Sequence, residues 1–430
     1  MRNAPHVMVP RDALSKIASS LERSGDLAFR HVPSDDLFVV SVVETAPSVR
    51  QQVDIPRQYS ALRSGDALFH GKWVRTPGGL ANLTHLQLLQ RPGTMLPHED
   101  ATSLFGVSIN PGAQISLVLT HDSALPEELR KAGVQEFAGW AVTREGAFPY
   151  PTSLEPEILG LSQLSGLWPL AETASLSIAV VGCGSIGSVA ADALAGYGVG
   201  ALHLIDNDRL LWHNLIRHRL GPESVGRFKS AALADAIQER WTNDNVVSHP
   251  IDVVRSADVF RSVIREVNLV LCAADGIAPR RVVSHAARRA GVPAVLACVL
   301  DQGAIGEIVR LRPSPRFGCL LCLRAQLAGE GAMDAEADQE LAYGTGEVHQ
   351  PMTASPGDLQ AVGIFAAKAA IATHLESRYG DSSQLLPGEH AVLGLRPQRD
   401  LVPPFNLEHA GEVRWSSIPP PREGCPTCNP

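Results

Sequence analysis

The 430-residue sequence has no apolar run of the roughly 18 residues that a membrane helix needs. Its first residues, MRNAPHVMVPRDALSK, also lack the apolar core of a signal peptide. Positive charge is not in excess, because 37 Lys and Arg stand against 45 Asp and Glu, a net charge of −8. These absences argue against a membrane protein and against a non-specific nucleic-acid binder. We therefore expect a soluble, cytoplasmic protein.

Charged residues are also few, at 19% of the chain, whereas 45% of the residues are hydrophobic. A disordered chain has the opposite balance, so folded domains with apolar cores are expected. At about 100–200 residues per domain, the length predicts two or three domains. Residues 150–172 contain three prolines and few charges. We place a boundary there, between domains at 1–155 and 165–430.

The two domains differ in their predicted secondary structure. The first is a smaller mixed α/β domain, with strands expected at 37–43 and 114–119 and a short helix at 125–132. In the second, strands are expected at 177–181, 201–205, 268–272 and 293–300, and helices at 228–241, 279–290 and 364–376. This alternation predicts a Rossmann-like, doubly wound α/β fold with a mainly parallel sheet.

Gly182, Gly184 and Gly187 form a G-x-G-x-x-G turn between a predicted strand and a predicted helix. Glycines permit a tight turn and close approach of the backbone to phosphate, and the helix N-terminus offers unpaired N–H groups. Asp206 ends the next strand, 19 residues after Gly187, where a carboxylate reaches a ribose hydroxyl. The pattern predicts a nucleotide site but does not separate NAD from ATP.

Four further motifs follow in order: IDND at 205–208, NLIR at 214–217, VGRFK at 225–229 and AADG at 273–276. This series resembles the ThiF/MoeB superfamily of adenylyltransferases, which includes ubiquitin-activating enzymes and the sulfur-carrier activators of thiamin and molybdopterin synthesis. The resemblance covers about residues 172–430. It implies that the nucleotide is ATP, and that a C-terminal carboxylate of a small protein attacks its α-phosphorus.

The resemblance also implies roles for single residues. Asp206 would hold the ribose, with Asp208 in the same nucleotide site. Asn214, Arg217 and Lys229 would contact the phosphates, and Asp275 would hold Mg²⁺.

Relatives often carry an R-Y-x-R-Q segment before the glycine strand, and its arginine enters the active site of a dimer partner. Residues 151–208 contain no arginine. Such an arginine must come from elsewhere, either from the N-terminal domain or from another subunit.

The chain has seven cysteines, and an odd number in a chain of this length does not fit a secreted disulfide framework. Four of them form two C-x-x-C pairs: Cys319 with Cys322, and Cys425 with Cys428. Four thiolates at this spacing predict a tetrahedral structural Zn²⁺ site, with a redox dithiol as the alternative. The remaining three lie in the glycine loop or on apolar strands and are expected to be buried and inert: Cys183, Cys272 and Cys298.

No cysteine lies between Cys322 and Cys425. Ubiquitin-activating enzymes of the thioester type place a nucleophilic cysteine there, in a crossover loop that corresponds to about 323–356. One explanation is that the enzyme only adenylates and passes the acyl-adenylate directly to a partner nucleophile.

A second explanation is that a hydroxyl replaces the thiol. Thr353 stands where a related P-x-C segment has its cysteine, and His349 is near it in sequence. An oxyester would then form on Thr353, with Ser355 and Thr345 as rival positions. The third explanation is that Cys298 or Cys272 serves as the nucleophile.

The N-terminal domain is faintly similar to a JAB/MPN metalloprotease domain, from His85 to about Asp100. The H-x-H-P metal motif would fall on 89–92, where both histidines are absent. The likeness implies an inactive domain that binds a ubiquitin-like protein or a conjugating enzyme, or that forms a dimer. An inactive adenylation-type half is the alternative.

Together these features predict ATP-dependent adenylation of the C-terminal carboxylate of a ubiquitin-like, β-grasp protein in a bacterial ubiquitination-like pathway. The predicted cofactors are ATP, Mg²⁺ and structural Zn²⁺. The predicted partners are that small protein, a conjugating enzyme and a second copy of the chain, with no nucleic acid or membrane. A sulfur-carrier or peptide-modifying adenylyltransferase is the enzymatic alternative, and a scaffold that binds a ubiquitin-like protein is the non-enzymatic one.

Overall fold

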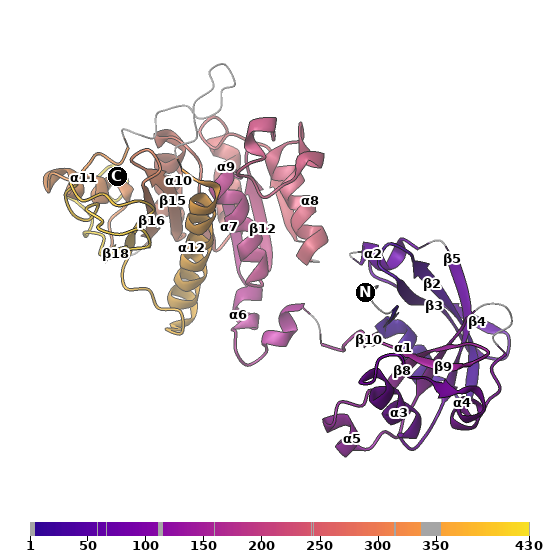
Figure 1. The fold of residues 1–430 in the computed structure, drawn as a ribbon. Coiled ribbons are helices and arrows are strands. Elements are labelled where there is room, and N and C mark those ends of the chain that lie inside the picture. Colours follow the sequence, from indigo (N-terminus) through magenta and orange to yellow (C-terminus); the bar gives the residue numbers. More distant parts are fainter. Residues whose placement is uncertain are drawn as a thin grey trace. The chain divides into compact units, whose positions relative to one another are not determined.

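The chain forms two compact units, Met1–Leu159 and Gly160–Pro430 (Figure 1). The computed structural model describes residues 5–57, 59–65, 67–110, 115–158, 160–241, 243, 245–313, 315–336 and 354–429. The division between the units falls in the Pro-containing stretch from which the domain boundary was predicted.

Unit 1 is built on a ten-stranded mixed sheet in the order β10-β1-β3-β2-β5-β7-β8-β9-β6, with β4 paired to β3. Its strands are β1 His6–Val9, β2 Ser24–Val32, β3 Leu37–Ala46, β4 Val49–Gln52, β5 Ala67–Arg75, β6 Leu96–Pro97, β7 Ser116–His121, β8 Phe137–Val142, β9 Gly146–Tyr150 and β10 Thr152–Leu154. The apolar runs that predicted strands at 37–43 and 114–119 correspond to β3 and β7.

The described residues of unit 1 also form five helices: α1 Arg11–Ser19, α2 Ser60–Arg63, α3 Leu80–Leu89, α4 His98–Phe105 and α5 Glu127–Lys131. Helix α1 packs Leu14 and Ile17 into a core with the fully buried Trp73. A second small core surrounds Trp140. Residues 89–92, the predicted site of the degenerate H-x-H-P motif, lie at the end of α3 and just beyond it.

Unit 2 contains an eight-stranded sheet in the order β13-β12-β11-β14-β15-β16-β17-β18. Its strands are β11 Ser177–Val181, β12 Ala201–Ile205, β13 Val246–His249, β14 Leu269–Cys272, β15 Ala294–Leu300, β16 Ile305–Leu311, β17 His390–Gly394 and β18 Val413–Ser416. The first five pair in parallel and the last three antiparallel. The predicted Rossmann-like, doubly wound and mainly parallel fold is confirmed.

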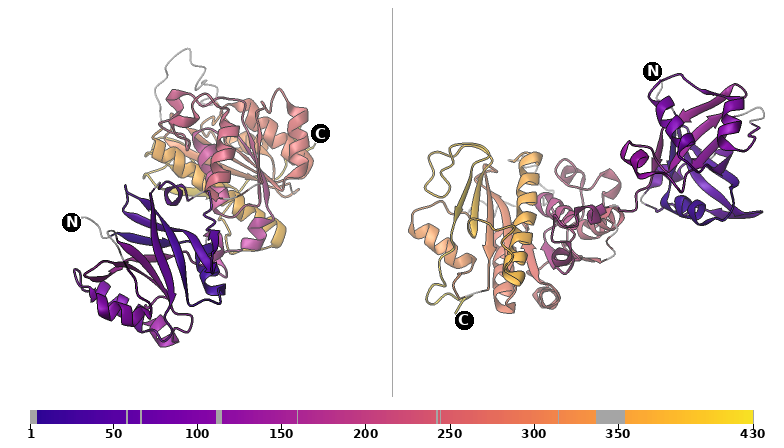
Figure 2. Two further views of the ribbon diagram at one scale, coloured as in Figure 1. Left: turned by 90° about the vertical axis from the view of Figure 1, so that its right-hand side faces the viewer. Right: turned by 90° about the horizontal axis from the view of Figure 1, so that it is seen from below.

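Helices cover both faces of this sheet (Figures 1 and 2). Helices α7, α8 and α12 share one core, and α9, α10 and α11 share the other. The helices are α6 Leu170–Ala174, α7 Ser185–Gly196, α8 Lys229–Trp241, α9 Ala257–Glu266, α10 Ile277–Ala290, α11 Leu320–Gly329 and α12 Pro356–His374, with short 3-10 helices η1 Gly160–Leu164, η2 Trp212–Asn214 and η3 Pro222–Ser224 and a π-helical turn η5 Leu375–Tyr379.

Helix α12 begins at Pro356, eight residues earlier than predicted. Ser355 caps it, since its Oγ accepts a hydrogen bond from the Asp358 backbone N–H at 3.1 Å. A proline in the first turn needs no backbone donor, so Pro356 starts the helix instead of marking a loop. The helix then lies against α7 along the sheet.

A buried ion network joins β15–β17 to the helices on the second face. Glu307, which is fully buried, accepts hydrogen bonds from Arg324 and from His390 Nε2 at 3.0 Å, and Arg280 lies 3.4 Å away. Burial alone would raise the pKa of Glu307, but Arg324 and His390 hold it well below its usual value. The charge is thus fully compensated, as a buried carboxylate requires.

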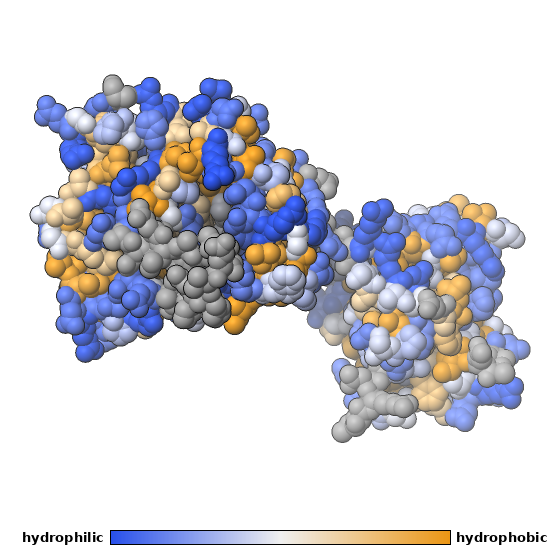
Figure 3. Space-filling view, turned by 90° about the horizontal axis from the view of Figure 1, so that it is seen from above, coloured by the Kyte–Doolittle hydropathy of each residue, from blue (hydrophilic) through white to orange (hydrophobic). Residues whose placement is uncertain are grey.

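Across the described ranges, no helix has the length and apolar character needed to cross a membrane. Figure 3 shows hydrophilic and hydrophobic residues intermingled on the viewed face of each unit.

Candidate functional site

The glycine turn joins β11 to α7 and needs its glycines for steric reasons. Gly182 has φ +82°, in the left-handed region that favours glycine. A Cβ on Gly187 would lie 1.8 Å from the Gly182 carbonyl oxygen, so helix and turn could not approach as they do. A Cβ on Gly184, by contrast, would meet no atom within 4 Å. Gly184 therefore faces open space, as a phosphate cradle requires.

Helix α7 begins directly at this opening. Its N-cap is Gly184, and no side chain caps the first turn. The N-terminal N–H groups and the positive end of the helix dipole therefore remain available to an anion.

Asp206 holds the glycine turn from behind. Its Oδ2 accepts a hydrogen bond from the Cys183 backbone N–H at 2.7 Å, and its Oδ1 accepts one from Asp208 N–H at 2.8 Å. Burial raises the pKa of Asp206, whereas the positive charge of Lys229 lowers it. A carboxylate oxygen has two lone pairs, so these bonds leave acceptor capacity for a ribose hydroxyl.

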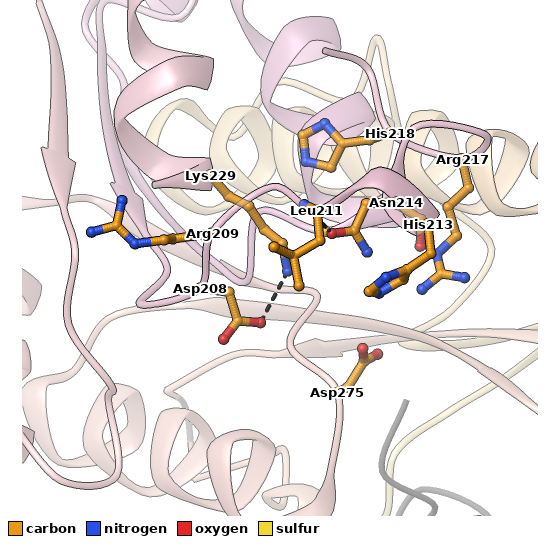
Figure 4. A pocket seen from close by; sticks show the side chains of 11 residues that line it. Asp208, Arg209, Leu211, His213, Asn214, Arg217, His218, Lys229 and Asp275 are labelled. Carbon is orange, nitrogen blue, oxygen red and sulfur yellow. Dashed lines mark hydrogen bonds and ion pairs between the residues drawn. The ribbon is translucent and has the colours of Figure 1, made fainter. Parts of the chain in front are cut away.

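The predicted phosphate and metal residues meet in one pocket (Figure 4). Its lining residues are Gly184, Ser185, Asp208, Arg209, Leu211, His213, Asn214, Arg217, His218, Lys229 and Asp275. Gly182 and Gly187 shape the turn but do not line the pocket, and neither does Asp206.

Lys229, the first residue of α8, crosses the pocket to Asp208. Its Nζ lies 2.9 Å from Asp208 Oδ2, and its side chain is only 12% exposed. An arriving phosphate would compete with Asp208 for this ammonium group. The pair therefore keeps Lys229 in place before the nucleotide binds.

Asp275 follows β14 and points into the pocket from the side opposite Arg217 and Asn214 (Figure 4). It is accessible to solvent, yet the protein around it raises its pKa by desolvation, while Lys229 and Arg217 lower it. Within the described residues it makes no hydrogen bond and no ion pair. An unpaired carboxylate in a pocket is a suitable ligand for a divalent cation.

Asn214 is held so that one polar atom remains free. The side-chain Oδ1 accepts a hydrogen bond from Leu211 N–H at 2.9 Å. This leaves the amide nitrogen to donate, and Figure 4 shows it turned toward the pocket. Arg217 lies one turn further along the same segment, so the two donors flank one side.

The four cysteines of the C-x-x-C pairs come together at the start of α11. The Cys319 Sγ lies 3.5 Å from Cys425 Sγ and 3.9 Å from Cys322 Sγ, and Cys322 Sγ lies 3.9 Å from Cys428 Sγ. A tetrahedron of sulfurs at about 2.3 Å from Zn²⁺ has edges of about 3.8 Å. The sulfur positions therefore fit a structural zinc ion.

Backbone contacts shape this cluster as well. The Arg422 N–H donates to Cys322 Sγ at 3.3 Å. Gly318 donates its N–H to the Pro419 carbonyl at 2.7 Å, and a Cβ there would lie 2.6 Å from the Cys322 Cβ. The C-terminal segment is thus fastened to α11 through atoms that surround the sulfurs.

A profile of the ThiF family matches residues 163–380, just over half of the chain. The chain belongs to the ThiF family. The matched range includes the glycine turn, the whole pocket and the first C-x-x-C pair of this ThiF chain.

Two adenylyltransferases are similar to this chain over part of their length. The sulfur carrier protein ThiS adenylyltransferase of Bacillus subtilis is 30% identical over 145 residues, which are 33% of this chain and 43% of that protein. The molybdopterin-synthase adenylyltransferase of Salmonella typhimurium is 30% identical over 158 residues, 36% of this chain and 61% of that protein. The chain thus spans less than two thirds of either relative.

Among solved structures, E. coli MccB with ATP is similar to the chain at 16% identity and a TM-score of 0.44. The match covers 60% of this chain and 68% of that one.

Five lining residues of the ThiF domain's pocket were not predicted as site residues from the sequence: Ser185, Arg209, Leu211, His213 and His218. His218 directly follows the NLIR motif, which is the signal that could have drawn attention to it. Its Nδ1 accepts a hydrogen bond from Leu220 N–H at 3.1 Å, so the proton is on Nε2, which donates to the Cys183 carbonyl at 2.7 Å. A neutral histidine therefore holds the glycine turn.

This histidine should make the ThiF domain sensitive to acid. Burial lowers the pKa of His218 from 6.5 to about 4. The unfolded chain therefore binds a proton that the folded one does not, and stability falls as pH drops from 6.5 toward 4. Between pH 7 and pH 5 the loss should be about 2 kcal/mol, as measured by urea unfolding.

His218→Gln is the matched variant, since a glutamine can accept from Leu220 and donate to Cys183 without titrating. Its stability should change less between the two pH values than that of the unaltered chain. An equal pH dependence in both proteins would refute the assignment to His218.

The described part of the chain includes only some of the candidate nucleophiles and their sequence neighbours. Thr353, His349 and Thr345 lie outside the described residues. Ser355 is the cap of α12, and its Oγ also donates to Asp358 Oδ2 at 2.8 Å, which gives it a structural role.

The three cysteines outside the C-x-x-C pairs are buried, as predicted. Burial raises the pKa of Cys183 and of Cys272, and that of Cys298 to about 12. A thiol with so high a pKa carries almost no thiolate at neutral pH. Neither Cys272 nor Cys298 is therefore suited to act as a nucleophile.

Proposed function

We propose that this chain uses ATP to adenylate the C-terminal carboxylate of a small ubiquitin-like, β-grasp protein. The observation that carries the proposal is the single pocket that joins the open α7 N-terminus at Gly184 to Lys229, Arg217 and Asp275. Anion-binding groups thus surround a space beside one unpaired carboxylate. This combination suits a nucleoside triphosphate with its metal ion.

The reaction would proceed by one displacement at phosphorus. A carboxylate oxygen of the substrate attacks the α-phosphorus of ATP, and the bond from that phosphorus to the oxygen bridging to the β-phosphate breaks. Pyrophosphate leaves with the bond's electron pair, and an acyl-adenylate remains. Because two anions must meet, catalysis depends on charge neutralisation and alignment.

Each site residue would have its own role in this reaction. The α7 N–H groups, Lys229 and Arg217 neutralise phosphate oxygens, and the Asn214 amide donates to them. Asp206 accepts from the ribose, and Asp208 releases Lys229 as phosphate arrives. Asp275 fits Mg²⁺, which when bound would neutralise charge on the phosphates.

Two kinds of observation support the substrate class: the proteins for which the relatives are named, and the domain and cysteine content of this chain. Two ThiF relatives are named for a sulfur carrier protein and for molybdopterin synthase. This chain also contains the compact unit 1, and it has no cysteine between Cys322 and Cys425. We therefore favour a ubiquitination-like pathway with a conjugating-enzyme partner over sulfur transfer. For the arginine that is missing from residues 151–208, we favour a second copy of the chain in a homodimer, or unit 1, as the source.

Unit 1 has no assigned chemistry, and we propose a binding role for it. An inactive JAB/MPN-like or inactive adenylation-like domain would present the ubiquitin-like protein or the conjugating enzyme. The alternatives remain a sulfur-carrier or peptide-modifying adenylyltransferase and a non-catalytic scaffold.

ATP–pyrophosphate exchange tests the proposal. Labelled pyrophosphate should enter ATP only when a purified β-grasp protein with a free C-terminal carboxylate is present, and not when its last two residues are removed. Exchange with no β-grasp protein would contradict the substrate class. Exchange supported by a short peptide instead would favour the peptide-modifying alternative.

The path after adenylation can be tested at Thr353. If the Thr353 hydroxyl carries the acyl group, incubation with ATP and the β-grasp protein should join that protein covalently to the chain. Hydroxylamine should cleave this adduct, and a reducing thiol should not. Thr353→Ala should abolish the adduct and keep pyrophosphate exchange. An adduct that survives the substitution would place the acyl group on another residue, and no adduct at all would leave direct transfer of the acyl-adenylate as the mechanism.

A further inference from the structure

A second groove lies on unit 2, between α9 and α10, away from the residues of the ATP pocket. It encloses about 830 Å³. Its lining residues are Ala257, Phe260, Arg261, Ile264, Arg265, Arg281, Val282, His285, Ala286, Arg289, Ala290, Val292, Leu321 and Thr427.

The helical period explains how the two helices make an apolar floor. On α9 the lining residues recur at three- and four-residue steps, with Phe260 and Ile264 buried beneath the groove. On α10 the half-buried Val282 and Ala286 recur in the same way. Because neighbouring turns of both helices contribute, the floor runs along the helices and resembles a seat for a third helix.

Positive charge surrounds this floor. Four exposed arginines and His285 stand along it, and no carboxylate is among the lining residues. Arg261, Arg265 and Arg289 make no ion pair or hydrogen bond with the rest of the described chain. The chain as a whole carries a net charge of −8, so this concentration of arginine is local.

One arginine of the groove already binds a carboxylate of the chain itself. Arg281 donates to Glu336 through Nε at 3.3 Å and through Nη2, and Glu336 is 8% exposed. This two-pronged contact is the preferred way in which arginine binds a carboxylate. The groove margin is therefore built to pair with acidic side chains.

The groove also contacts the cysteine cluster. Thr427, which lies between Cys425 and Cys428, is hydrogen-bonded to His285, with 3.3 Å between Thr427 Oγ1 and His285 Nδ1. Leu321, between Cys319 and Cys322, also lines the groove. The segments that carry the four cysteines thus form part of the groove wall.

We propose that this groove binds an acidic amphipathic helix of a protein partner. Apolar residues on one side of that helix would cover Val282 and Ala286, and its Asp or Glu side chains would pair with Arg261, Arg265 and Arg289. About three turns would match the ten-residue length of α9. A nucleic acid fits less well, because Phe260, the one Phe, Tyr or Trp among the described lining residues, is fully buried and leaves no face for base stacking.

The proposal is tested with a designed peptide and the full chain. The probe is a fluorescein-labelled 16-residue helix with leucines at three- and four-residue spacing and glutamates beside them. A scrambled peptide of the same composition and the oligonucleotide dT16 are the comparison probes. Fluorescence anisotropy should show at least tenfold tighter binding of the amphipathic peptide than of either comparison probe.

Variants of the chain then locate the binding. Arg261→Glu with Arg265→Glu should weaken peptide binding at least tenfold, and Ala290→Trp should do so by filling the groove without changing charge. Arg378→Glu with Arg399→Glu, two exposed arginines elsewhere on unit 2, should change it less than twofold. Melting temperature and zinc content would confirm that each variant folds.

Several outcomes would overturn the proposal. Equal binding of the scrambled peptide or of dT16 would reduce the groove to a general polyanion surface. No binding, or binding that the groove variants leave unchanged, would refute it directly. If the same variants instead change the sedimentation of the protein alone, the groove is an interface between copies of the chain.

Discussion

Asp275→Asn should lower the rate of ATP–pyrophosphate exchange by about 10³-fold, while the protein remains folded. The substitution keeps the size of the side chain but removes its charge. Asp275 is the pocket carboxylate without an ion pair in the described chain, so the metal ion would lose its main anionic ligand. Without that ion, the repulsion between the attacking carboxylate and the triphosphate is opposed only by Lys229, Arg217 and the α7 N-terminus.

The matched control is Asp235→Asn, an exposed carboxylate on α8 that pairs with Arg227 outside the pocket. Exchange should change less than twofold there, because an exposed ion pair contributes little. Thermal melting with and without Mg²⁺ and ATP adds a second measurement: stabilisation by ATP should need Mg²⁺ in the unaltered chain and lose that dependence in Asp275→Asn. Full exchange activity in Asp275→Asn would refute both the metal role and the proposed reaction centre.

The sequence was most informative where function depends on local geometry. Gly182, Gly184 and Gly187 lie within six residues, and each is explained by the turn itself. Asp206, Lys229 and Asp275 follow strands or begin a helix, so the carboxyl ends of parallel strands bring them together. The pattern of a doubly wound sheet therefore implied the pocket as well as the fold.

Features that depend on distant pairing could not be predicted in this way. Glu307, Arg324 and His390 form one network from three separate segments, and no spacing in the sequence indicates it. The basic groove exists only because α9 and α10 lie side by side on the sheet. His218 acts through a backbone carbonyl, and such contacts leave no mark in residue type.

The strand order of the unit 1 sheet also depends on pairing between distant segments, so the sequence did not predict it. Strand β1 pairs in parallel with both β3 and β10, although Thr152, the β10 partner of Val7, lies 145 residues further along the chain. Short apolar runs identified β3 and β7, but their partners are set by tertiary packing around Trp73 and Trp140. Local propensity therefore located strands without giving their order.

Replacing Cys425 and Cys428 with serine should release zinc and destabilise unit 2 alone. A metal ion held by the four sulfurs would fasten the C-terminal segment to α11, and the loss of two ligands would leave an incomplete site. A cost of at least about 4 kcal/mol is expected for such a loss, which corresponds to a fall in melting temperature of about 10 °C. Zinc per chain, measured by plasma emission, should fall from about one to zero.

Cys298→Ala is the control, because it removes a buried thiol and leaves all four zinc ligands in place. It should keep its zinc and lose less stability. Since unit 1 has its own cores, its unfolding transition should stay where it is while that of unit 2 moves. An unaltered chain purified without chelators that holds no zinc, and whose melting depends on reducing agent, would instead indicate a redox dithiol. Because Thr427 and Leu321 line the basic groove, zinc release should also weaken binding of the acidic peptide. The ATP pocket is built from residues 184–275 and should keep its affinity for ATP.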